Sequence, residues 1–259
     1  DALFGDARVE AILSDEHRIA AMLRAEFALA RAQGAAGVIP TRSASAIERS
    51  ANVSDYDLPA LAADAAQAGN LAIPLVKQLT ERVRRIDADA AAHVHWGATS
   101  QDIIDTALVL QLRDATSVIL ASLARAGDAA AALARAHAGT VMPGRTWMQH
   151  ATPTTFGLKA AGWMSALDRA HADVARALSS ALVLQLGGAS GTLAALGDRA
   201  LGIATAMAEE LELAVPTLPW HAHRDRLGTL ACTLGVAVGT MGKIARDIAL
   251  LAQTEVAEA

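Results

Sequence analysis

Residues 95–106 combine side chains that could bind a carboxylate and supply a proton. The sequence there is His-Trp-Gly-Ala-Thr-Ser-Gln-Asp-Ile-Ile-Asp-Thr, and it places His95 four residues before Thr99. Thr99 or Ser100 can cap a helix that begins here, with Asp102 in its first turn, and this structural role is one interpretation. A helix start also presents free N–H groups and the positive end of the dipole, so the hydroxyls beside it predict a carboxylate pocket. His95 could add a charge or a proton, although a histidine alone is more often structural.

Residues 144–157 form a second polar segment, Gly-Arg-Thr-Trp-Met-Gln-His-Ala-Thr-Pro-Thr-Thr-Phe-Gly, just before a helix expected to start at Thr154. Its hydrogen-bond donors stand close together and are Arg145, Thr146, Gln149 and His150. A plain connecting loop rarely concentrates so many donors. The segment therefore predicts a binding site, and a solvated connection is the alternative.

Two further segments lack the pattern of a nucleotide or metal site. Residues 185–192, Gln-Leu-Gly-Gly-Ala-Ser-Gly-Thr, have no Gly-Lys-Ser/Thr ending and follow a helix instead of a strand, which excludes a P-loop and a dinucleotide fingerprint. The backbone N–H groups of such a loop could still bind an anion. In residues 220–226, Trp-His-Ala-His-Arg-Asp-Arg, the two histidines stand two positions apart and do not share a helical face. We expect no metal site.

The elements that position these segments are expected to be helices. Apolar spacing and the places of Gly and Pro predict helices over Asp6–Gln33, Ser43–Ser50, Asp55–Ala68, Ile73–Arg85, Ser100–Ala138, Thr154–Leu182, Arg199–Leu213 and Arg224–Ala259. Residues 139–153 are expected to form a loop, and no alternating strand pattern extends beyond a few residues. The predicted fold class is all-α, with a smaller N-terminal helical domain over residues 1–95 and a long-helix bundle over residues 96–259.

Composition excludes several classes of protein. Apolar residues make up 53% of the chain and aromatic residues 3%, which favours long buried helices. The formal net charge is −5 and no dense Lys/Arg run occurs, so we expect neither a nucleic-acid nor a membrane partner.

Cys232 is the only cysteine, is expected to be buried, and fits a reducing cytoplasm. The first ten residues show no signal-peptide pattern, and the uncharged stretch Leu227–Gly242 is shorter than the roughly 20 residues of a spanning helix.

The last helical run carries four glycines that share one helical face, at positions 228, 235, 239 and 242. Each glycine costs about 1 kcal/mol of helix propensity. We therefore expect another helix to pack very close to this face. Helices as long as Ser100–Ala138 cannot bury their apolar faces in a monomer of this size, so the sequence predicts an oligomeric bundle.

The four polar segments, in this order and at these separations, resemble the fumarase/aspartase superfamily over nearly the whole chain. Residues 97–106 match the first conserved region of the superfamily, and residues 144–159, which end in Phe-Gly-Leu-Lys, match the second. Arg224-Asp-Arg226 and Gln253-Thr-Glu-Val256 are similar to adenylosuccinate lyase.

Two departures from the lyase pattern point to one branch of the superfamily. Many of the lyases carry a histidine that acts as an acid directly after the Arg-Thr pair, where this chain has Trp147. Where adenylosuccinate lyase has a Thr-x-His-Asp type of segment, this chain has residues 69–74, Gly-Asn-Leu-Ala-Ile-Pro. Both features, and the pattern Trp-His-x-x-Arg-Asp-Arg in residues 220–226, are similar to the bacterial carboxymuconate cycloisomerases.

The resemblance implies a reversible lactonisation of 3-carboxy-cis,cis-muconate, a step of aromatic-compound degradation. One carboxylate adds across a conjugated double bond, and the neighbouring carbon takes a proton. A tri-anion must be held by donors and cations, and its enolate-like transition state needs donors already in place. The residues carried over by position are Asn70, Thr99, Arg145, Thr146, Trp147 and Gln149 for substrate binding and His95, His150 and Ser100 for catalysis. Trp147 would shape the pocket and exclude water.

The resemblance also implies that no cofactor is needed and that a homotetramer shares its sites between subunits. The mobile loop that carries the catalytic serine of the family is expected just after Glu255, so with Ala259 as its last residue the bundle domain is expected to be incomplete at its C-terminal end. Three alternatives stay open. They are an adenylosuccinate- or argininosuccinate-type lyase, a cycloisomerase for a sulfonated muconate, and a non-catalytic structural protein.

Overall fold

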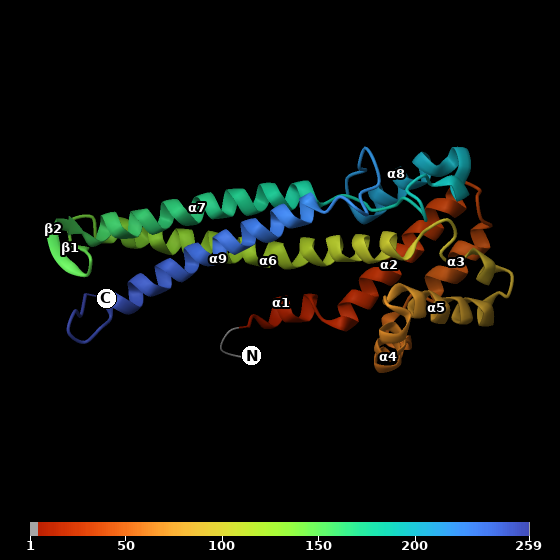
Figure 1. The fold of residues 1–259 in the computed structure, drawn as a ribbon, viewed down its shortest axis with the longest axis horizontal. Coiled ribbons are helices and arrows are strands. Elements are labelled where there is room, and N and C mark those ends of the chain that lie inside the picture. Colours follow the sequence, from red (N-terminus) through yellow and green to blue (C-terminus); the bar gives the residue numbers. More distant parts are fainter. Residues whose placement is uncertain (1–4, 259) are drawn as a thin grey trace. The chain divides into compact units, whose positions relative to one another are not determined.

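The computed structural model describes residues 5–258, and most of them are helical (Figure 1). The elements in chain order are α1 (Ala7–Ile12), α2 (Asp15–Ala35), α3 (Thr41–Arg49), η1 (Val53–Asp55), α4 (Leu58–Ala68), α5 (Ala72–Ile86), η2 (Ala90–His93), α6 (Ser100–Ala136), β1 (Val141–Thr146), β2 (Gln149–Thr155), α7 (Phe156–Ala181), η3 (Ala194–Arg199), α8 (Ala200–Leu211) and α9 (Asp225–Leu251). The all-α fold class is confirmed, with one small hairpin added to it.

By their internal contacts the residues form two compact units. Unit 1 consists of Asp1–Ala115 and Ala181–Arg224, and unit 2 of Thr116–Ser180 and Asp225–Ala259. This division differs from the single boundary near residue 95 that the sequence suggested. The reason is that contacts between segments distant in sequence define each unit, and α6 begins in one unit and ends in the other.

Unit 1 is built around α2, which contacts α3 and α8. Its fully buried side chains include Met22, Leu23 and Leu29 of α2. The single helix expected over Asp6–Gln33 is in fact two helices. The side-chain oxygen of Ser14 accepts the backbone N–H of His17 at 3.2 Å, and this N-cap starts a new helix after α1 has ended.

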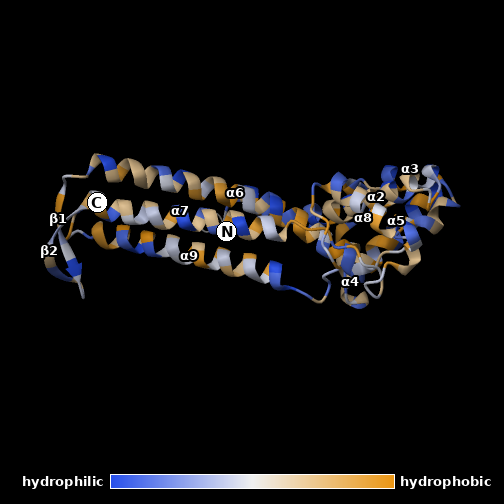
Figure 2. Cartoon of the chain, turned by 90° about the horizontal axis from the view of Figure 1, so that it is seen from above, coloured by the Kyte–Doolittle hydropathy of each residue, from blue (hydrophilic) through white to orange (hydrophobic). Residues whose placement is uncertain are grey.

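In unit 2, α7 and α9 lie beside the C-terminal part of α6 (Figures 1 and 2). Their shared core contains Leu123 of α6, Trp163 and Val174 of α7, and Ala237 of α9. The indole nitrogen of Trp163 donates a hydrogen bond to Asp247 at 2.8 Å, which joins α7 to α9 and satisfies a polar group that would otherwise be buried without a partner.

The loop expected over residues 139–153 is mostly an antiparallel hairpin of β1 and β2, in which Arg145 pairs with His150 and Thr146 with Gln149. The connecting residues Trp147 and Met148 both have positive φ, at 51° and 58°. Two central residues in this region define a type I′ turn, which normally uses Asn-Gly or Asp-Gly. Trp-Met does not carry that signal, which is why the sequence predicted a loop over residues 139–153. The hairpin shows that this prediction was wrong.

Helix α9 differs from expectation at its end and in its exposure. The helix stops at Leu251 instead of continuing to Ala259, and the chain then turns so that the N–H of Glu258 donates to the carbonyl of Leu251 at 3.0 Å. Within one chain, large apolar side chains of α9 such as Val236 and Val238 are exposed, and Cys232, expected to be buried, is exposed as well. Hydrophobic residues recur along the length of this helix in Figure 2.

Two helices in the described residues, α6 and α9, are long and apolar enough to cross a membrane by length and composition alone. The core helices of water-soluble bundles also meet these two criteria.

Candidate active site

The carboxylate of Asp102 is the centre of a hydrogen-bond network in unit 1. Asp102 is fully buried in the first turn of α6. Its two oxygens accept four hydrogen bonds of 2.9–3.0 Å, from the backbone N–H groups of Thr99, Gly187 and Gly188 and from the side-chain amide of Gln185. A buried carboxylate is stable when several donors satisfy it. The glycine-rich segment does bind an anion with its backbone, as its composition suggested, and in the folded chain that anion is Asp102.

The glycine-rich segment also lies tightly against His221. A Cβ atom at Gly187 would stand 2.5 Å from the His221 ring, so this position requires glycine. The Nε2 atom of His221 is buried and 3.4 Å from an Asp102 oxygen. Residues 95–106, 185–192 and 220–224, from three segments that the sequence singled out separately, are therefore in contact in unit 1.

A second ion pair holds the segment after Trp220. The guanidinium group of Arg224 donates two hydrogen bonds, of 2.5 and 2.8 Å, to the buried carboxylate of Asp105. The hydrogen bonds to Asp105 raise the pKa of Arg224 above its usual value. Because the pairing is bidentate, it fixes the orientation of Arg224 as well as its distance.

His95 is paired with an acid that the sequence did not reveal. Its Nδ1 atom lies 2.6 Å from Oε1 of Glu26 in α2, and 17% of the His95 side chain is exposed against 1% of Glu26. Burial of the ring lowers its pKa, but the charge and hydrogen bond of Glu26 and the charge of Asp102 outweigh this, so the pKa of His95 is raised. The ring is therefore more readily protonated than a free imidazole.

The predicted hydroxyl donors lie at the start of α6, directly after the turn from His95 to Ala98. Thr99 and Ser100 are half-buried, and no residue in the described part of the chain forms a hydrogen bond with either hydroxyl. Both hydroxyls are therefore available to a ligand. Asn70, also predicted to bind substrate, lies at the start of α5, where its side-chain oxygen accepts the N–H of Ile73 at 3.2 Å. That contact is a helix-capping one.

The other predicted residues lie in unit 2, on the hairpin. Arg145 of β1 donates two hydrogen bonds, of 2.6 and 2.9 Å, to the carboxylate of Glu258. These bonds raise the pKa of Arg145 and lower that of Glu258, and the charge of His150 lowers the pKa of Glu258 further. A guanidinium group that holds a carboxylate in this forked geometry can hold a carboxylate of a ligand in the same way.

Three of the predicted hairpin residues, Thr146, Trp147 and Gln149, are exposed in the single chain. Trp147 is at the tip of the hairpin and is 94% exposed. The role expected for it, shaping a pocket and excluding water, has no counterpart among residues 5–258 of a single chain and stays a prediction for an assembly of several chains.

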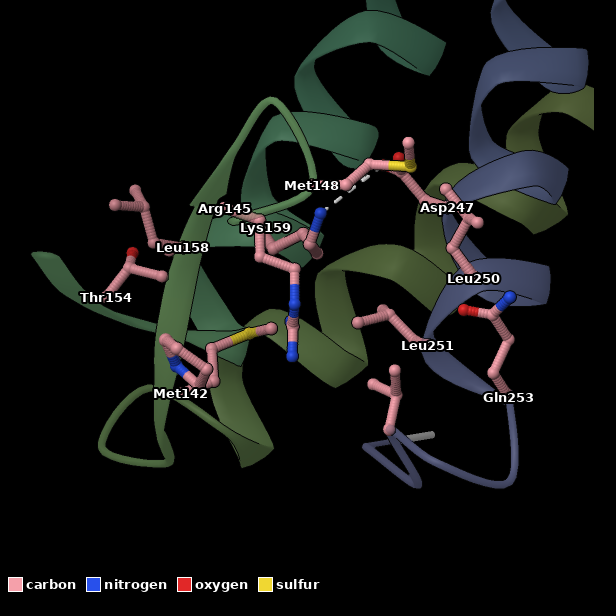
Figure 3. Close-up of a pocket in the computed structure, with 13 residues that line it drawn as sticks. Met142, Arg145, Met148, Thr154, Leu158, Lys159, Asp247, Leu250, Leu251 and Gln253 are labelled. Atoms are coloured by element: carbon pink, nitrogen blue, oxygen red, sulfur yellow. Dashed lines mark ion pairs between the residues drawn. The ribbon is translucent and has the colours of Figure 1, made fainter. Parts of the chain in front are cut away.

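The hairpin forms one wall of a cavity of about 510 Å³ with α7 and the end of α9 (Figure 3). Its polar lining residues are Arg145, Thr154, Lys159, Asp247 and Gln253, and the ammonium group of Lys159 lies 3.7 Å from Asp247. Both cationic groups of this cavity are paired with carboxylates, Arg145 with Glu258 and Lys159 with Asp247. Lys159 belongs to the second conserved segment, but the sequence did not reveal that it lines the same cavity as Arg145.

The structure therefore places the predicted residues in two groups. His95, Thr99, Ser100 and Asn70 belong to unit 1, and Arg145, Thr146, Trp147, Gln149 and His150 to unit 2. Among residues 5–258, no three His, Cys, Asp or Glu side chains are arranged to hold a metal ion.

The partners missed by sequence reasoning are acids. Two patterns in the sequence point to these acids. Glu26 interrupts an apolar stretch of α2, and Asp102 stands three positions after Thr99, the spacing of a helix capping box.

A sequence profile described as Lyase matches residues 5–259. The chain belongs to this lyase family of the fumarase/aspartase superfamily, as the four polar segments indicated.

Individual relatives within the family are similar over the entire chain. The 3-carboxy-cis,cis-muconate cycloisomerase of Bradyrhizobium diazoefficiens is 50% identical over 257 residues, which are 99% of this chain and 57% of that protein. The enzyme of the same name from Pseudomonas aeruginosa is 50% identical over 258 residues, covering 100% of this chain and 56% of that protein. The crystal structure of the 3-carboxy-cis,cis-muconate lactonizing enzyme from Pseudomonas putida superposes with a TM-score of 0.97 at 48% identity, covering 99% of this chain and 58% of that one. This chain thus spans less than two thirds of the length of these relatives.

Proposed function

We propose that the full-length protein is a cycloisomerase that converts 3-carboxy-cis,cis-muconate, a small tricarboxylate, into its lactone. The observation that carries this proposal is the pair of hydroxyls of Thr99 and Ser100, which have no hydrogen-bond partner among the described residues and stand at the positive end of α6, after the turn from His95 to Ala98. The 50% identity to enzymes named for this reaction supports the same substrate.

The proposed reaction assigns a role to each of these groups. A substrate carboxylate oxygen forms a C–O bond to one alkene carbon, and the electron pair of the double bond moves to the adjacent carbon, which then takes a proton. Negative charge spreads over another substrate carboxylate during this step. Donors fixed before the reaction stabilise that charge best. Thr99 and Ser100 would bind one carboxylate, and the raised pKa of His95 suits it to donate a proton or balance charge.

Arg145 would hold a second substrate carboxylate. Its guanidinium group already holds the carboxylate of Glu258 through two hydrogen bonds. Lys159, in the same cavity, adds a second cationic group, which lies 3.7 Å from Asp247. His150, which the resemblance made a catalytic candidate, lies opposite Arg145 in the hairpin and is exposed, so it could reach a ligand bound there.

We further propose that the protein is a homotetramer whose sites combine unit 1 of one chain with unit 2 of another. The predicted residues fall into these two units, and each unit holds only part of the donor set. Helix α9 supplies a surface for association. Val236 and Val238 are about 70% exposed in the single chain, at 68% and 71%, and a Cβ at Gly235 would meet no atom within 4 Å. Burial of such apolar area favours assembly by about 25 cal/mol per Å².

The proposed reaction uses only substrate atoms and one proton, so it needs no cofactor. We also propose a cytoplasmic location, where a single exposed thiol such as Cys232 stays reduced.

The hydroxyl pocket can be tested with Thr99→Ala and Ser100→Ala in the full-length protein. Each change should lower kcat/KM for 3-carboxy-cis,cis-muconate about 10- to 100-fold, because a hydrogen bond to a charged group contributes about 1.5–3 kcal/mol. Stability should be unchanged, since neither hydroxyl has a partner among the described residues. Turnover is followed as loss of the conjugated-diene absorbance, and unfolding by circular dichroism.

Ser45→Ala is the matched control, because Ser45 is an exposed serine of α3 far from any predicted site residue in sequence. Normal turnover in both Thr99→Ala and Ser100→Ala would remove the carboxylate-pocket proposal. The same assays with a sulfonated muconate, and measurement of fumarate release from adenylosuccinate and argininosuccinate, separate the three enzyme alternatives.

The assembly can be tested by adding a side chain to the glycine face of α9. Gly235→Leu should shift the protein from tetramer to smaller species in sedimentation velocity, because another helix is proposed to pack against that face. Gly202→Leu in α8 is the matched control, since Gly202 is also an exposed helical glycine with nothing within 4 Å of its Cβ position. Both changes raise helix propensity by about 1 kcal/mol, so neither should unfold the chain. A tetramer in both variants, or a monomeric parent protein, contradicts the proposal.

A further inference from the structure

The buried carboxylate of Glu26 is the feature of unit 1 that the proposed reaction leaves without a role. Glu26 is in the middle of α2, 1% exposed, between Ala25 and Phe27. A buried carboxylate without compensation is strongly unfavourable. Its Oε1 atom is paired with Nδ1 of His95, 69 positions away in sequence, while its Oε2 atom has no hydrogen-bond partner in the described part of the chain. A buried carboxylate with one unpaired oxygen, such as that of Glu26, needs an explanation other than packing.

The backbone that carries His95 is held from the same face of α2. Glu26 and Gln33 are seven positions apart and therefore share a helical face. The amide of Gln33, also fully buried, donates to the carbonyl of Trp96 at 2.6 Å. His95 has a φ of 58°, which non-glycine residues seldom adopt. A Cβ at Gly97 would stand 2.7 Å from Leu196, so the turn after His95 is also confined on its other side.

We propose that Glu26 is the positioning residue for His95, fixing the orientation of the imidazole and the proton on Nδ1 so that Nε2 faces the substrate as the proton donor. This inference rests on the role that the proposed function gives to His95. A carboxylate at Nδ1 makes that nitrogen a hydrogen-bond donor, which leaves Nε2 for the reaction. No described residue forms a hydrogen bond with Nε2.

The charges around the ring come from two helices. Glu26 of α2 and Asp102 of α6 are the acids that act on it, and His221, from the segment after Trp220, lies 3.4 Å from Asp102. Asp102 is already satisfied by four donors, whereas Glu26 has only His95 among the described residues. Glu26 is therefore the acid whose effect on the ring can be removed selectively.

Glu26→Gln in the full-length protein tests this inference. Glutamine keeps the size of the side chain and an oxygen for Nδ1 but removes the charge that raises the pKa of His95. The alkaline limb of kcat/KM against pH is expected to move about one pH unit or more to lower pH. At pH 8, kcat should fall about tenfold or more while KM changes less than about threefold, because proton donation and not substrate binding is affected.

Gln33→Leu is the matched control on the same face of α2. It removes the hydrogen bond to the backbone of Trp96 but leaves the charge of Glu26 in place, so it should lower stability without moving the pH limb. Equal pH profiles for the parent protein and Glu26→Gln overturn the proposal, as does the same shift in Gln33→Leu. If Glu26→Gln does not fold, Glu26→Asp, which draws the carboxylate back by one methylene, should show a smaller shift in the same direction, and no shift overturns the proposal.

A measurement without substrate separates this inference from the proposed function. Because the pKa of His95 is higher in the folded than in the unfolded protein, its contribution to stability is complete below the unfolded value of about 6.5 and is lost as pH rises through the folded value. The melting temperature of the parent protein should fall over this window relative to that of Glu26→Gln. If the parent protein is inactive but its melting temperature differs from that of Glu26→Gln in this way, the proposed reaction is refuted and the Glu26–His95 pair is not. Identical melting profiles refute the pair itself.

Discussion

Asp102→Ala is expected to lower the free energy of unfolding by about 3–5 kcal/mol, because it leaves several buried donors without an acceptor, each worth about 1–3 kcal/mol. Three of the four donors belong to a segment more than 80 positions from Asp102 in sequence, since the separation is 83 for Gln185 and 86 for Gly188, while Thr99 is three positions away. The loss should appear as a decrease of the melting temperature of about 6–20 °C, at roughly 2–4 °C per kcal/mol for a chain of this size. Turnover should fall too, because the same network holds the turn of His95.

Asp225→Ala is the matched control for this change. Asp225 is also an aspartate in the first turn of a long helix, but it is exposed, so its removal affects only the helix dipole, by about 0.3–1 kcal/mol. Asp102→Asn should fall between the two, because an amide keeps one acceptor oxygen. All variants must be compared at one protein concentration, since assembly contributes to the melting temperature. Equal losses for Asp102→Ala and Asp225→Ala would show that the network adds nothing to stability.

Arg145→Lys is expected to lower kcat/KM by about a hundredfold, although the positive charge is kept. A lysine cannot provide the two parallel N–H donors that bind a carboxylate in the fork of a guanidinium group. Arg145→Ala should lower kcat/KM by about a thousandfold, as expected when one partner of a charged hydrogen-bonded pair is removed. Calorimetric titration with propane-1,2,3-tricarboxylate should show the same order of affinities, parent protein above lysine above alanine.

Arg125→Lys is the control for Arg145, since Arg125 is an exposed arginine of α6 in the same unit, and its guanidinium group donates a hydrogen bond to Ser122. It should keep normal turnover and affinity. An Arg145→Lys protein with the kinetics of the parent would contradict a bidentate role for Arg145. A parent protein that gives no heat with the tricarboxylate would favour the remaining alternative, a non-catalytic structural protein.

Most of the helices could be predicted from the sequence because their signals are local. The predicted Ser43–Ser50, Ile73–Arg85 and Thr154–Leu182 each lie within two residues of α3, α5 and α7 at both ends. Apolar spacing, proline and glycine act within one or two turns, so a window of residues suffices to read them. The break at Ser14 was missed because apolar periodicity continues across it, while the cap depends on the conformation of one side chain.

The hairpin illustrates the opposite case. Residues 144–157 are visible in the sequence as a donor-rich segment, but the turn residues Trp147 and Met148 adopt positive φ against their own preference. Such a conformation costs about 1–2 kcal/mol per residue and persists only where the surroundings impose it. No local rule predicts it, so the pairing of Arg145 with His150 became visible only in the structure.

The amino-acid sequence by itself determined the superfamily, the helical fold and the residues that carry polar chemistry, because these depend on residue types and short spacings. Only the tertiary structure decided the partners of those residues. Glu26 meets His95 across 69 positions, and Asp102 meets Gly188 across 86. Contacts of this kind follow from how helices pack, which depends on the sum of many weak interactions and not on a pattern at either end.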